Sequence, residues 1–170
     1  MKTKVILALC VGLVLGLVPS AYAQLIAGSP EDKAFEKILV ENNADAKATL
    51  LLDYEKQFPQ SKVLTDIYMM LMEIYRQKND NGKVIEVGEK VIKIDAENVT
   101  ALMAVSRNYA LERKNLDRAV QYAQKAVDSV AKLRAKPAPA NFTEQQWKDY
   151  VESTDQAAKS ILAYTKSLKP

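Results

Sequence analysis

One short motif places a hydroxyl and an amine where they could act together. Ser129-Val130-Ala131-Lys132 puts the two groups three residues apart, so in a helix they lie on neighbouring turns. An amine beside a serine hydroxyl could accept its proton and make the oxygen a nucleophile for acyl transfer. The S-D-N and K-T-G motifs that accompany such a pair in serine acyl-transfer enzymes are absent. We therefore expect an ordinary solvated helix end here.

Paired carboxylates are the other candidates for catalysis, because two acids can divide the roles of general acid and general base. Asp66 with Glu73, and Glu86 with Glu89, are such pairs by spacing. Lysines are interspersed among these acids. Lys90, for example, follows Glu86 by four residues, a spacing at which a helix joins opposite charges. We therefore expect surface ion pairs at these positions and no catalytic site.

The composition excludes most other chemistry. The 170 residues include no His and one Cys, and they carry 24 basic and 21 acidic side chains. The cysteine is Cys10, so imidazole triads, disulfides and Cys/His metal sites cannot form in the rest of the chain. A chain this close to neutrality offers no basic stripe for a phosphate backbone. We expect no nucleic-acid partner, no metal and no cofactor.

Residues 1–23 have the pattern of a secretory signal peptide. Lys2 and Lys4 precede an apolar run over residues 5–18, and a small-residue end follows at residues 21–23. The run is shorter than the roughly 20 residues that span a bilayer. We expect cleavage after residue 23 and export to the periplasm or beyond the cell.

Helices are predicted for nearly all of the remaining chain, because helix breakers are scarce and Ala, Leu, Glu, Lys and Gln are abundant. A short tether at 24–30 precedes the first helix. The expected helices cover about 31–41, 45–58, 62–78, 83–94, 99–112, 116–133 and 144–168. The expected N-caps are Ser29, Ser61, Asn98, Asn115 and Thr143, the last in a capping box with Gln146.

The end of the chain is predicted to be a linker followed by one long helix. Residues 134–142 contain Pro137 and Pro139, which keep their predecessors out of helix and make this stretch an extended linker. In the segment 143–170, Trp147 and other apolar residues recur at helical spacing. That helix could cover its own domain or exchange onto a neighbouring molecule.

Two helical hairpins of the same pattern follow each other along the chain. Tyr68, Leu71, Met72 and Tyr75 recur at one fixed offset as Leu102, Val105, Ser106 and Tyr109. We call this offset, which leads from Tyr68 to Leu102, the repeat interval. Val84, Gly88 and Val91 recur one position beyond that interval as Ala119, Ala123 and Ala126. A single hairpin cannot cover its own apolar faces, so hairpins of this kind are expected to stack.

With these spacings, residues 65–98 and 99–133 resemble tetratricopeptide repeats, and the pair 31–58 resembles a degenerate third copy. The resemblance implies an all-α fold. In it, antiparallel hairpins stack over 31–133 as a short right-handed solenoid, and the long C-terminal helix caps the stack. It also implies a concave groove lined by the first helix of each hairpin.

Two residues depart from the pattern of the family. Met72 is large where the family has a small residue, and Gly88 replaces the aromatic residue of the second helix. We expect these two changes to compensate each other in volume, because protein cores tolerate exchanges that conserve the total volume.

The candidate binding site lies on the face of the first helices that should point away from their neighbours. Its members are Asp66, Met69, Glu73 and Arg76 in one repeat and Thr100, Met103 and Arg107 in the next. Methionine suits adaptable binding surfaces, and arginine supplies oriented hydrogen bonds. The alternative is that Met69 and Met103 are ordinary packing beneath the N-terminal helix.

The sequence therefore predicts an exported, non-enzymatic interaction module or scaffold subunit of the bacterial cell envelope, which binds a segment of another protein in this groove. Two alternatives stay open. One is a carrier whose helices enclose an apolar small molecule or lipid, for which Trp147 is the relevant feature. The other is a structural subunit that forms homo-oligomers through an exposed apolar end face.

Overall fold

The computed structural model describes residues 25–169, which form seven α-helices and no strand. The helices are α1 (Pro30–Val40), α2 (Ala44–Gln57), α3 (Leu64–Gln77), α4 (Asn81–Ile94), α5 (Val99–Leu111), α6 (Leu116–Arg134) and α7 (Glu144–Ser167). The all-α prediction is therefore confirmed for this part of the chain. The expected signal peptide at 1–23 lies outside the described residues.

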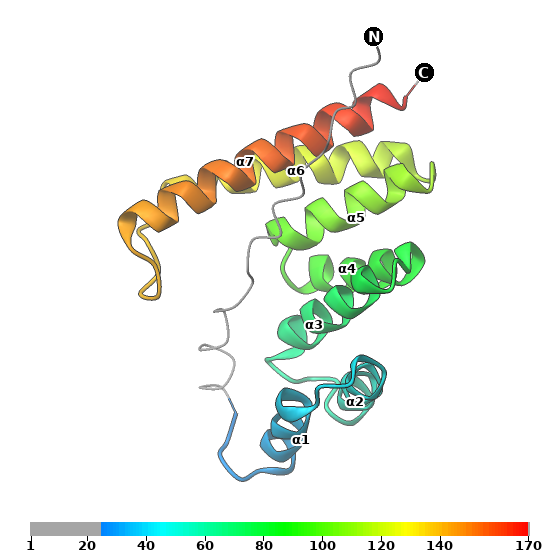
Figure 1. Cartoon of the computed structure of the whole chain (residues 1–170), viewed down its shortest axis with the longest axis vertical. Helices are drawn as coiled ribbons and strands as arrows, with labels where there is room; N and C mark the ends of the chain where they lie inside the picture. Colours follow the sequence, from blue (N-terminus) through cyan, green and yellow to red (C-terminus); the bar gives the residue numbers. More distant parts are fainter. Residues whose placement is uncertain (1–24, 170) are drawn as a thin grey trace.

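The helices follow one another along the long axis of the molecule (Figure 1). The α1–α2 pair lies at one end, and α6 and α7 lie at the other. Each helix packs against its successor in the chain, and α7 packs against α5 as well as α6. The last helix therefore covers the α5–α6 pair of its own chain.

Three of the predicted helix starts are confirmed by their capping bonds. The Ser29 hydroxyl accepts a hydrogen bond from the backbone N–H of Asp32, and Asn98 accepts one from the N–H three residues later. Thr143 and Gln146 form a complete capping box at the start of α7. These bonds satisfy N–H groups that no helical carbonyl can reach.

Two of the expected caps were wrong in their chemistry. Ser61 accepts the N–H of Val63 within the preceding loop, so α3 begins at Leu64 without a side-chain cap. Asn115 stands at the N-cap of α6 but is left-handed, with φ 47°, and makes no capping bond. A cap that was not predicted is Asp80, which accepts from the N–H of Lys83 and starts α4 two residues earlier than expected.

The residues predicted to correspond in the two hairpins are all buried. The first set is Tyr68, Leu71, Met72 and Tyr75 with Leu102, Val105, Ser106 and Tyr109, and the second is Val84, Gly88 and Val91 with Ala119, Ala123 and Ala126. Tyr75 and Tyr109 also have alike surroundings. Lys83 Nζ lies 5.0 Å from the centre of the Tyr75 ring, and the guanidinium carbon of Arg118 lies 5.8 Å from that of Tyr109. Each cation comes from the following helix, where it can interact with the ring face.

The first helix of each hairpin also ends in the same way. Asn79 and Arg113 both have positive φ, 56° and 50°, and they are separated by the repeat interval. The next N–H after each of them reaches back to the helix. The two bonds run from Asp80 N–H to the Tyr75 carbonyl at 2.9 Å and from Lys114 N–H to the Tyr109 carbonyl at 3.0 Å. This six-to-one bond with a left-handed residue is the Schellman closure of a helix.

Gly88 lies at a close approach between α4 and α5. A Cβ atom added there would stand 2.4 Å from Val105 Cγ2 and 3.4 Å from Met72 Sδ. The first distance is a clash with a short, stiff side chain, and the second is a tight contact. Val105 therefore occupies most of the space that a larger residue at position 88 would need, and Met72, the expected partner in the volume exchange, borders that space.

We predict that Gly88→Ala lowers the free energy of unfolding by roughly 1–3 kcal/mol, because overpacking outweighs the gain in helix propensity. The added Val105→Ala change should restore most of that loss by removing the clashing methyl group. Urea unfolding followed by circular dichroism would measure both.

Gly82→Ala is the matched control, since a Cβ at Gly82 would meet only Asp80 Oδ1, at 3.7 Å. It should leave the stability unchanged or slightly raised. If Gly88→Ala behaved like this control, or if Gly88→Phe stabilised the protein, the space beside Gly88 would be empty and the volume exchange would be wrong.

Candidate functional site

The predicted groove residues lie on two helices, α3 and α5, that both pack against α4. Glu73, Arg76 and Thr100 are exposed, and Asp66, Met69, Met103 and Arg107 are half-buried. Met69 and Met103 pack against the buried core with part of the side chain. Each methionine therefore contributes both to the packing of its helix and to the surface, at equivalent positions of the two hairpins.

Within this set the structure brings one pair together. Arg76 donates from Nε and Nη2 to the two carboxylate oxygens of Glu73, at 2.7 and 2.5 Å, and Gln77 adds a third bond at 2.9 Å. The hydrogen bond from Arg76 lowers the pKa of Glu73, and the same bond raises the pKa of Arg76. The pair therefore holds one negative and one positive charge side by side near the C-terminal end of α3. No hydrogen bond or ion pair between described residues joins the α3 members to those on α5.

Two charged groups of the set have no partner among the described residues. Asp66 makes no side-chain hydrogen bond or ion pair there, and its burial raises the pKa of the carboxyl. Arg107, half-buried on α5, makes none either. A half-buried charge without a partner is poorly stabilised, so an oppositely charged or hydrogen-bonding group brought to either side chain would be favourable.

A carboxylate shared by three helices was not predicted. Glu55 on α2 accepts from the hydroxyl of Tyr68 on α3 at 2.8 Å and from Lys90 Nζ on α4 at 2.7 and 3.0 Å. The same Lys90 Nζ lies 5.2 Å from the centre of the Tyr68 ring. Burial alone would raise the pKa of Glu55, but the bonds from Lys90 and Tyr68 outweigh it and lower the pKa.

A second carboxylate does the same for the next hairpin. Glu89 on α4 accepts from the hydroxyl of Tyr109 on α5 at 3.0 Å. It also accepts from Arg118 Nη2 at 2.8 Å and from the Tyr122 hydroxyl at 3.0 Å, both on α6. Burial raises the pKa of both tyrosines. Glu55 and Glu89 are separated by the repeat interval, which is the signal by which the sequence could have identified them.

Some of the polar contacts between different helices or loops span nearly the same distance along the sequence. Four of them join residues 33 to 35 apart: Lys78 with Asp45, Lys90 with Glu55, Tyr122 with Glu89, and Lys132 with Glu97. Other contacts between helices have other separations, such as Tyr54 with Glu31 at 23 residues and Arg118 with Glu89 at 29 residues. We call the two groups of residues around Glu55 and Glu89 the inter-hairpin clamps.

Ser129 and Lys132 do not form the hydroxyl–amine pair that their spacing allowed. Ser129 is buried, so the expected solvated helix end is wrong for this residue, because it lies on the stripe of α6 that also buries Ala126 and Val130. Lys132 is exposed and forms an ion pair with Glu97. The expected pairing of Lys90 with Glu86 is also wrong, since Lys90 is bound to Glu55.

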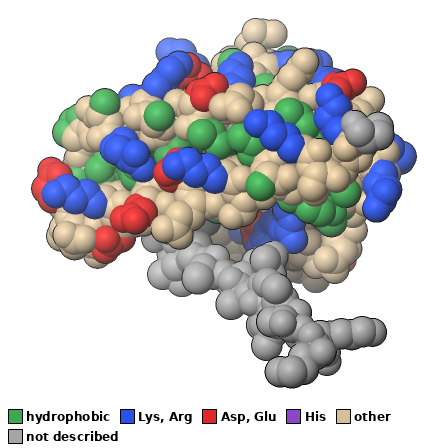
Figure 2. Space-filling model, turned by 90° about the horizontal axis from the view of Figure 1, so that it is seen from above, with side chains coloured by type: hydrophobic (Ala, Val, Ile, Leu, Met, Phe, Trp, Pro, Cys, Tyr) green, Lys and Arg blue, Asp and Glu red, His purple; other side chains and the backbone are tan. Residues whose placement is uncertain are grey.

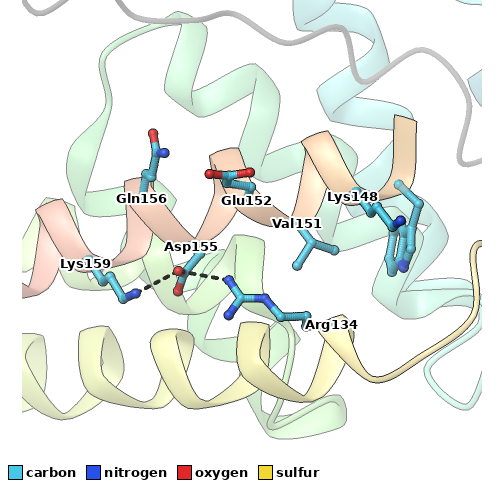
Figure 3. A pocket seen from close by; sticks show the side chains of 8 residues that line it. Arg134, Lys148, Val151, Glu152, Asp155, Gln156 and Lys159 are labelled. Atoms are coloured by element: carbon cyan, nitrogen blue, oxygen red, sulfur yellow. Dashed lines mark hydrogen bonds and ion pairs between the residues drawn. The ribbon is translucent and has the colours of Figure 1, made fainter. Parts of the chain in front are cut away.

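A groove of about 680 Å³ runs between α6 and α7 (Figure 3). At its centre Asp155 accepts from Lys159 at 2.7 Å and from Arg134 at 3.2 Å, as the dashed lines show. The bond from Lys159 lowers the pKa of Asp155. Its lining consists of Arg134, Trp147, Lys148, Val151, Glu152, Asp155, Gln156 and Lys159. Most of these residues are charged, and the carrier of an apolar molecule suggested by Trp147 stays a prediction.

The part of the chain that the structure describes has neither a metal-binding cluster nor a membrane-spanning helix. Residues 25–169 contain no group of three or more His, Cys, Asp or Glu residues that could hold a metal ion. In the same range no helix has the length and apolarity needed to cross a bilayer. Comparison with known protein families, curated proteins and solved structures found no match to this chain.

We predict that Glu55→Gln lowers the free energy of unfolding by about 1 kcal/mol near neutral pH, because Lys90 and Tyr68 lose an ionised acceptor. The folded-state pKa of Glu55 lies below its ordinary value of 4.5. Its stabilising contribution is therefore complete above that pH and is lost as the pH falls through the folded-state pKa. The difference between the parent protein and the variant should thus shrink in acid.

Denaturant unfolding near pH 7 and near pH 3.5 would test this expectation. Glu152→Gln is the control, because Glu152 is exposed and makes no ion pair with a described residue. A difference between parent and Glu55→Gln that was equal at both pH values would contradict the role of the ionised carboxylate.

Proposed function

We propose that residues 30–134 form three stacked hairpins of the tetratricopeptide kind, and that the protein is a non-enzymatic interaction module. In this proposal the outward faces of α3 and α5 bind a segment of another protein, and α7 caps the stack. Asp66, Met69, Glu73, Arg76, Thr100, Met103 and Arg107 are the proposed binding residues.

The stacking proposal is supported by the positions of the two inter-hairpin clamps. Glu55 and Glu89, one repeat interval apart, each join a second helix to the tyrosine and the cation of the following hairpin. The helix ends at Asn79 and Arg113 repeat at the same interval. A stack built by one repeated shift places equivalent residues in a row on each face.

The binding proposal rests chiefly on the state of Met69 and Met103. Both remain half-buried at equivalent positions of successive repeats, whereas corresponding core residues such as Tyr75 and Tyr109 are buried. Their flexible thioether side chains can adapt to apolar groups of a ligand. Asp66 and Arg107, each without a partner on the described surface, would supply charged anchors of opposite sign beside them.

The chemistry of these residues favours a peptide segment with apolar side chains for the methionines. Such a segment would carry a basic group for Asp66 and an acidic or carbonyl group for Arg107. An extended strand or one helix face could supply this pattern, and the scaffold would move little on binding because the clamps fix the hairpins. We also propose that residues 1–23 are cleaved during export. The partner would then lie in the cell envelope or outside the cell.

We predict that Met69→Glu combined with Met103→Glu weakens partner capture at least roughly tenfold, since an apolar surface cannot accommodate two added carboxylates. The helical circular dichroism should not change, because both positions are half-exposed. A photo-crosslinking residue at Thr100, introduced in the native host, would identify the attached protein by mass spectrometry.

Two controls make this test specific. Val40→Glu with Ile94→Glu adds the same charges at sites that are 74% and 54% exposed, on α1 and α4, and should leave capture intact. A photo-crosslinker at the exposed Gln121 on α6 should not attach the same protein. Capture that survived the double methionine change would locate the binding site elsewhere.

A further inference from the structure

Asn81 is the only asparagine in the chain that is followed by glycine. In such a pair the backbone nitrogen of the glycine can attack the side-chain amide carbon of the asparagine. The two groups lie close together along the chain, and glycine has no side chain that hinders the approach. Ammonia leaves, a cyclic succinimide forms, and water opens it at either carbonyl to give aspartate or isoaspartate. In a folded protein the reaction requires that neither group is held elsewhere.

The attacking nitrogen, that of Gly82, makes no hydrogen bond to a described residue. Gly82 is the second residue of α4, so its N–H is one of the first four of the helix, which have no helical carbonyl to bond. The capping side chain does not bond it either, since Asp80 Oδ1 accepts from the N–H of Lys83 at 3.0 Å. The nitrogen is therefore available for the attack.

The amide under attack is also unrestrained. The half-buried Asn81 side chain makes no hydrogen bond to a described residue. Gly82 is exposed, and a Cβ atom added there would meet only Asp80 Oδ1, at 3.7 Å. This open space lets water reach the peptide group between Asn81 and Gly82 and lets that group rotate into the reactive arrangement. Rotation is easiest in the first turn, because helix ends fray.

The other asparagines lack one or both of these features. Asn43 and Asn98 each cap a helix with the side-chain oxygen. Asn108 is buried and donates to the Ala104 carbonyl at 2.8 Å. The remaining ones precede residues that carry a side chain, in the pairs Asn42-Asn43, Asn79-Asp80, Asn115-Leu116 and Asn141-Phe142. Among the described residues, a following glycine and two unrestrained groups therefore coincide at position 81.

We propose that Asn81 is a site of spontaneous covalent modification, at which water converts the amide into isoaspartate and, in lesser amount, aspartate. The bond from the side-chain carbon to its nitrogen breaks, and an oxygen from water takes the place of the ammonia that leaves. The product therefore carries a carboxylate where the parent carries a neutral amide. The reaction needs water alone and is independent of the binding proposed for α3 and α5.

Isoaspartate would disturb the start of α4, because the main chain then runs through the former side chain and is longer by a methylene group. Two hydrogen bonds span position 81. They run from the Lys83 N–H to Asp80 Oδ1 and from the Val84 N–H to the Asp80 carbonyl, both at 3.0 Å. Both bonds depend on the ordinary length of chain between their ends. α4 contributes a residue to each inter-hairpin clamp, so the disturbed turn belongs to the helix that both clamps share.

The far end of the molecule provides an internal reference for this effect. α4 packs against α3 and α5 in the middle of the chain of helices (Figure 1). Figure 2 looks onto the end at which α6 and α7 lie, where hydrophobic side chains are interspersed with Lys and Arg. α7 packs chiefly against α5 and α6. A change confined to the first turn of α4 should therefore leave α7 unaffected.

Incubation of the purified protein at mildly alkaline pH, followed by trypsin digestion and electron-transfer mass spectrometry, tests the reaction. Trypsin releases residues 79–83, a peptide that contains Asn79 as an internal control beside Asn81. The parent protein should accumulate isoaspartate at position 81 while Asn79 stays largely unchanged. Gly82→Ala should slow the conversion several-fold. An Asn81 as stable as Asn79, or an equal rate in Gly82→Ala, would overturn the proposal.

The same incubation in urea separates the effect of the fold from that of the sequence. Because the fold leaves both groups unrestrained, Asn81 should convert in the folded protein at a rate within several-fold of its rate in urea. Conversion that takes place in urea and is absent from the folded protein would show that the fold protects Asn81, and would likewise overturn the proposal.

Hydrogen exchange of the modified protein, isolated by ion-exchange chromatography, tests the effect on α4. The amides of residues 82–85 should exchange faster than in the parent, and those of α7 should be unchanged. Asn81→Asp is the matched control, because it adds the same charge with an ordinary main chain at a place where a helix favours a carboxylate. Its exchange should equal that of the parent. Equal exchange in the isoaspartate form and in Asn81→Asp would overturn the proposed disturbance of α4.

Discussion

The carboxylates of Glu55 and Glu89 fix how the hairpins of this protein lie on one another. Apolar contacts between helices are not directional, and alone they allow neighbouring hairpins to slide or rotate. Each carboxylate instead collects a tyrosine hydroxyl and a cation from two different helices of the next hairpin. Glu55 thereby joins α2 to α3 and α4, and Glu89 joins α4 to α5 and α6. These directional bonds restrict how the five helices can move against one another.

Most of the fold could be predicted because its signals are local and periodic. All seven helices were expected, and the caps at Ser29, Asn98 and Thr143 could be identified from residue type and position alone. The errors occurred where a polar side chain could bond to more than one backbone N–H, or where several side chains could cap the same helix. Ser61 bonds within its own loop, and the turn before α4 supplied Asp80 as a cap in a cluster where several residues were equally able to act.

The surface was harder to predict than the core, because it depends on which long side chains meet across helices. Helical phase correctly left Glu73, Arg76 and Thr100 exposed. The other residues expected on the same outward face are half-buried, namely Asp66, Met69, Met103 and Arg107. Helical phase could not indicate that Lys90 would bind Glu55 and not Glu86, because the long, flexible lysine side chain can reach either carboxylate. The partners of Glu89 could not be predicted for the same reason. Glu89 nevertheless follows Glu55 by the repeat interval, which also separates corresponding core residues.

The two kinds of ion pair between hairpins differ in how strongly dissolved salt weakens them. In Lys90–Glu55 and Arg118–Glu89 the carboxylate side chains are only 24% and 19% exposed, whereas in Lys78–Asp45 and Lys132–Glu97 the acids are 83% and 52% exposed. Counter-ions reach the second kind readily and the first kind poorly. As ionic strength rises, the outer links between hairpins are therefore screened first, while the sheltered carboxylates keep the hairpins in register. The exposed ion pairs can therefore weaken in salt while the helices keep their arrangement.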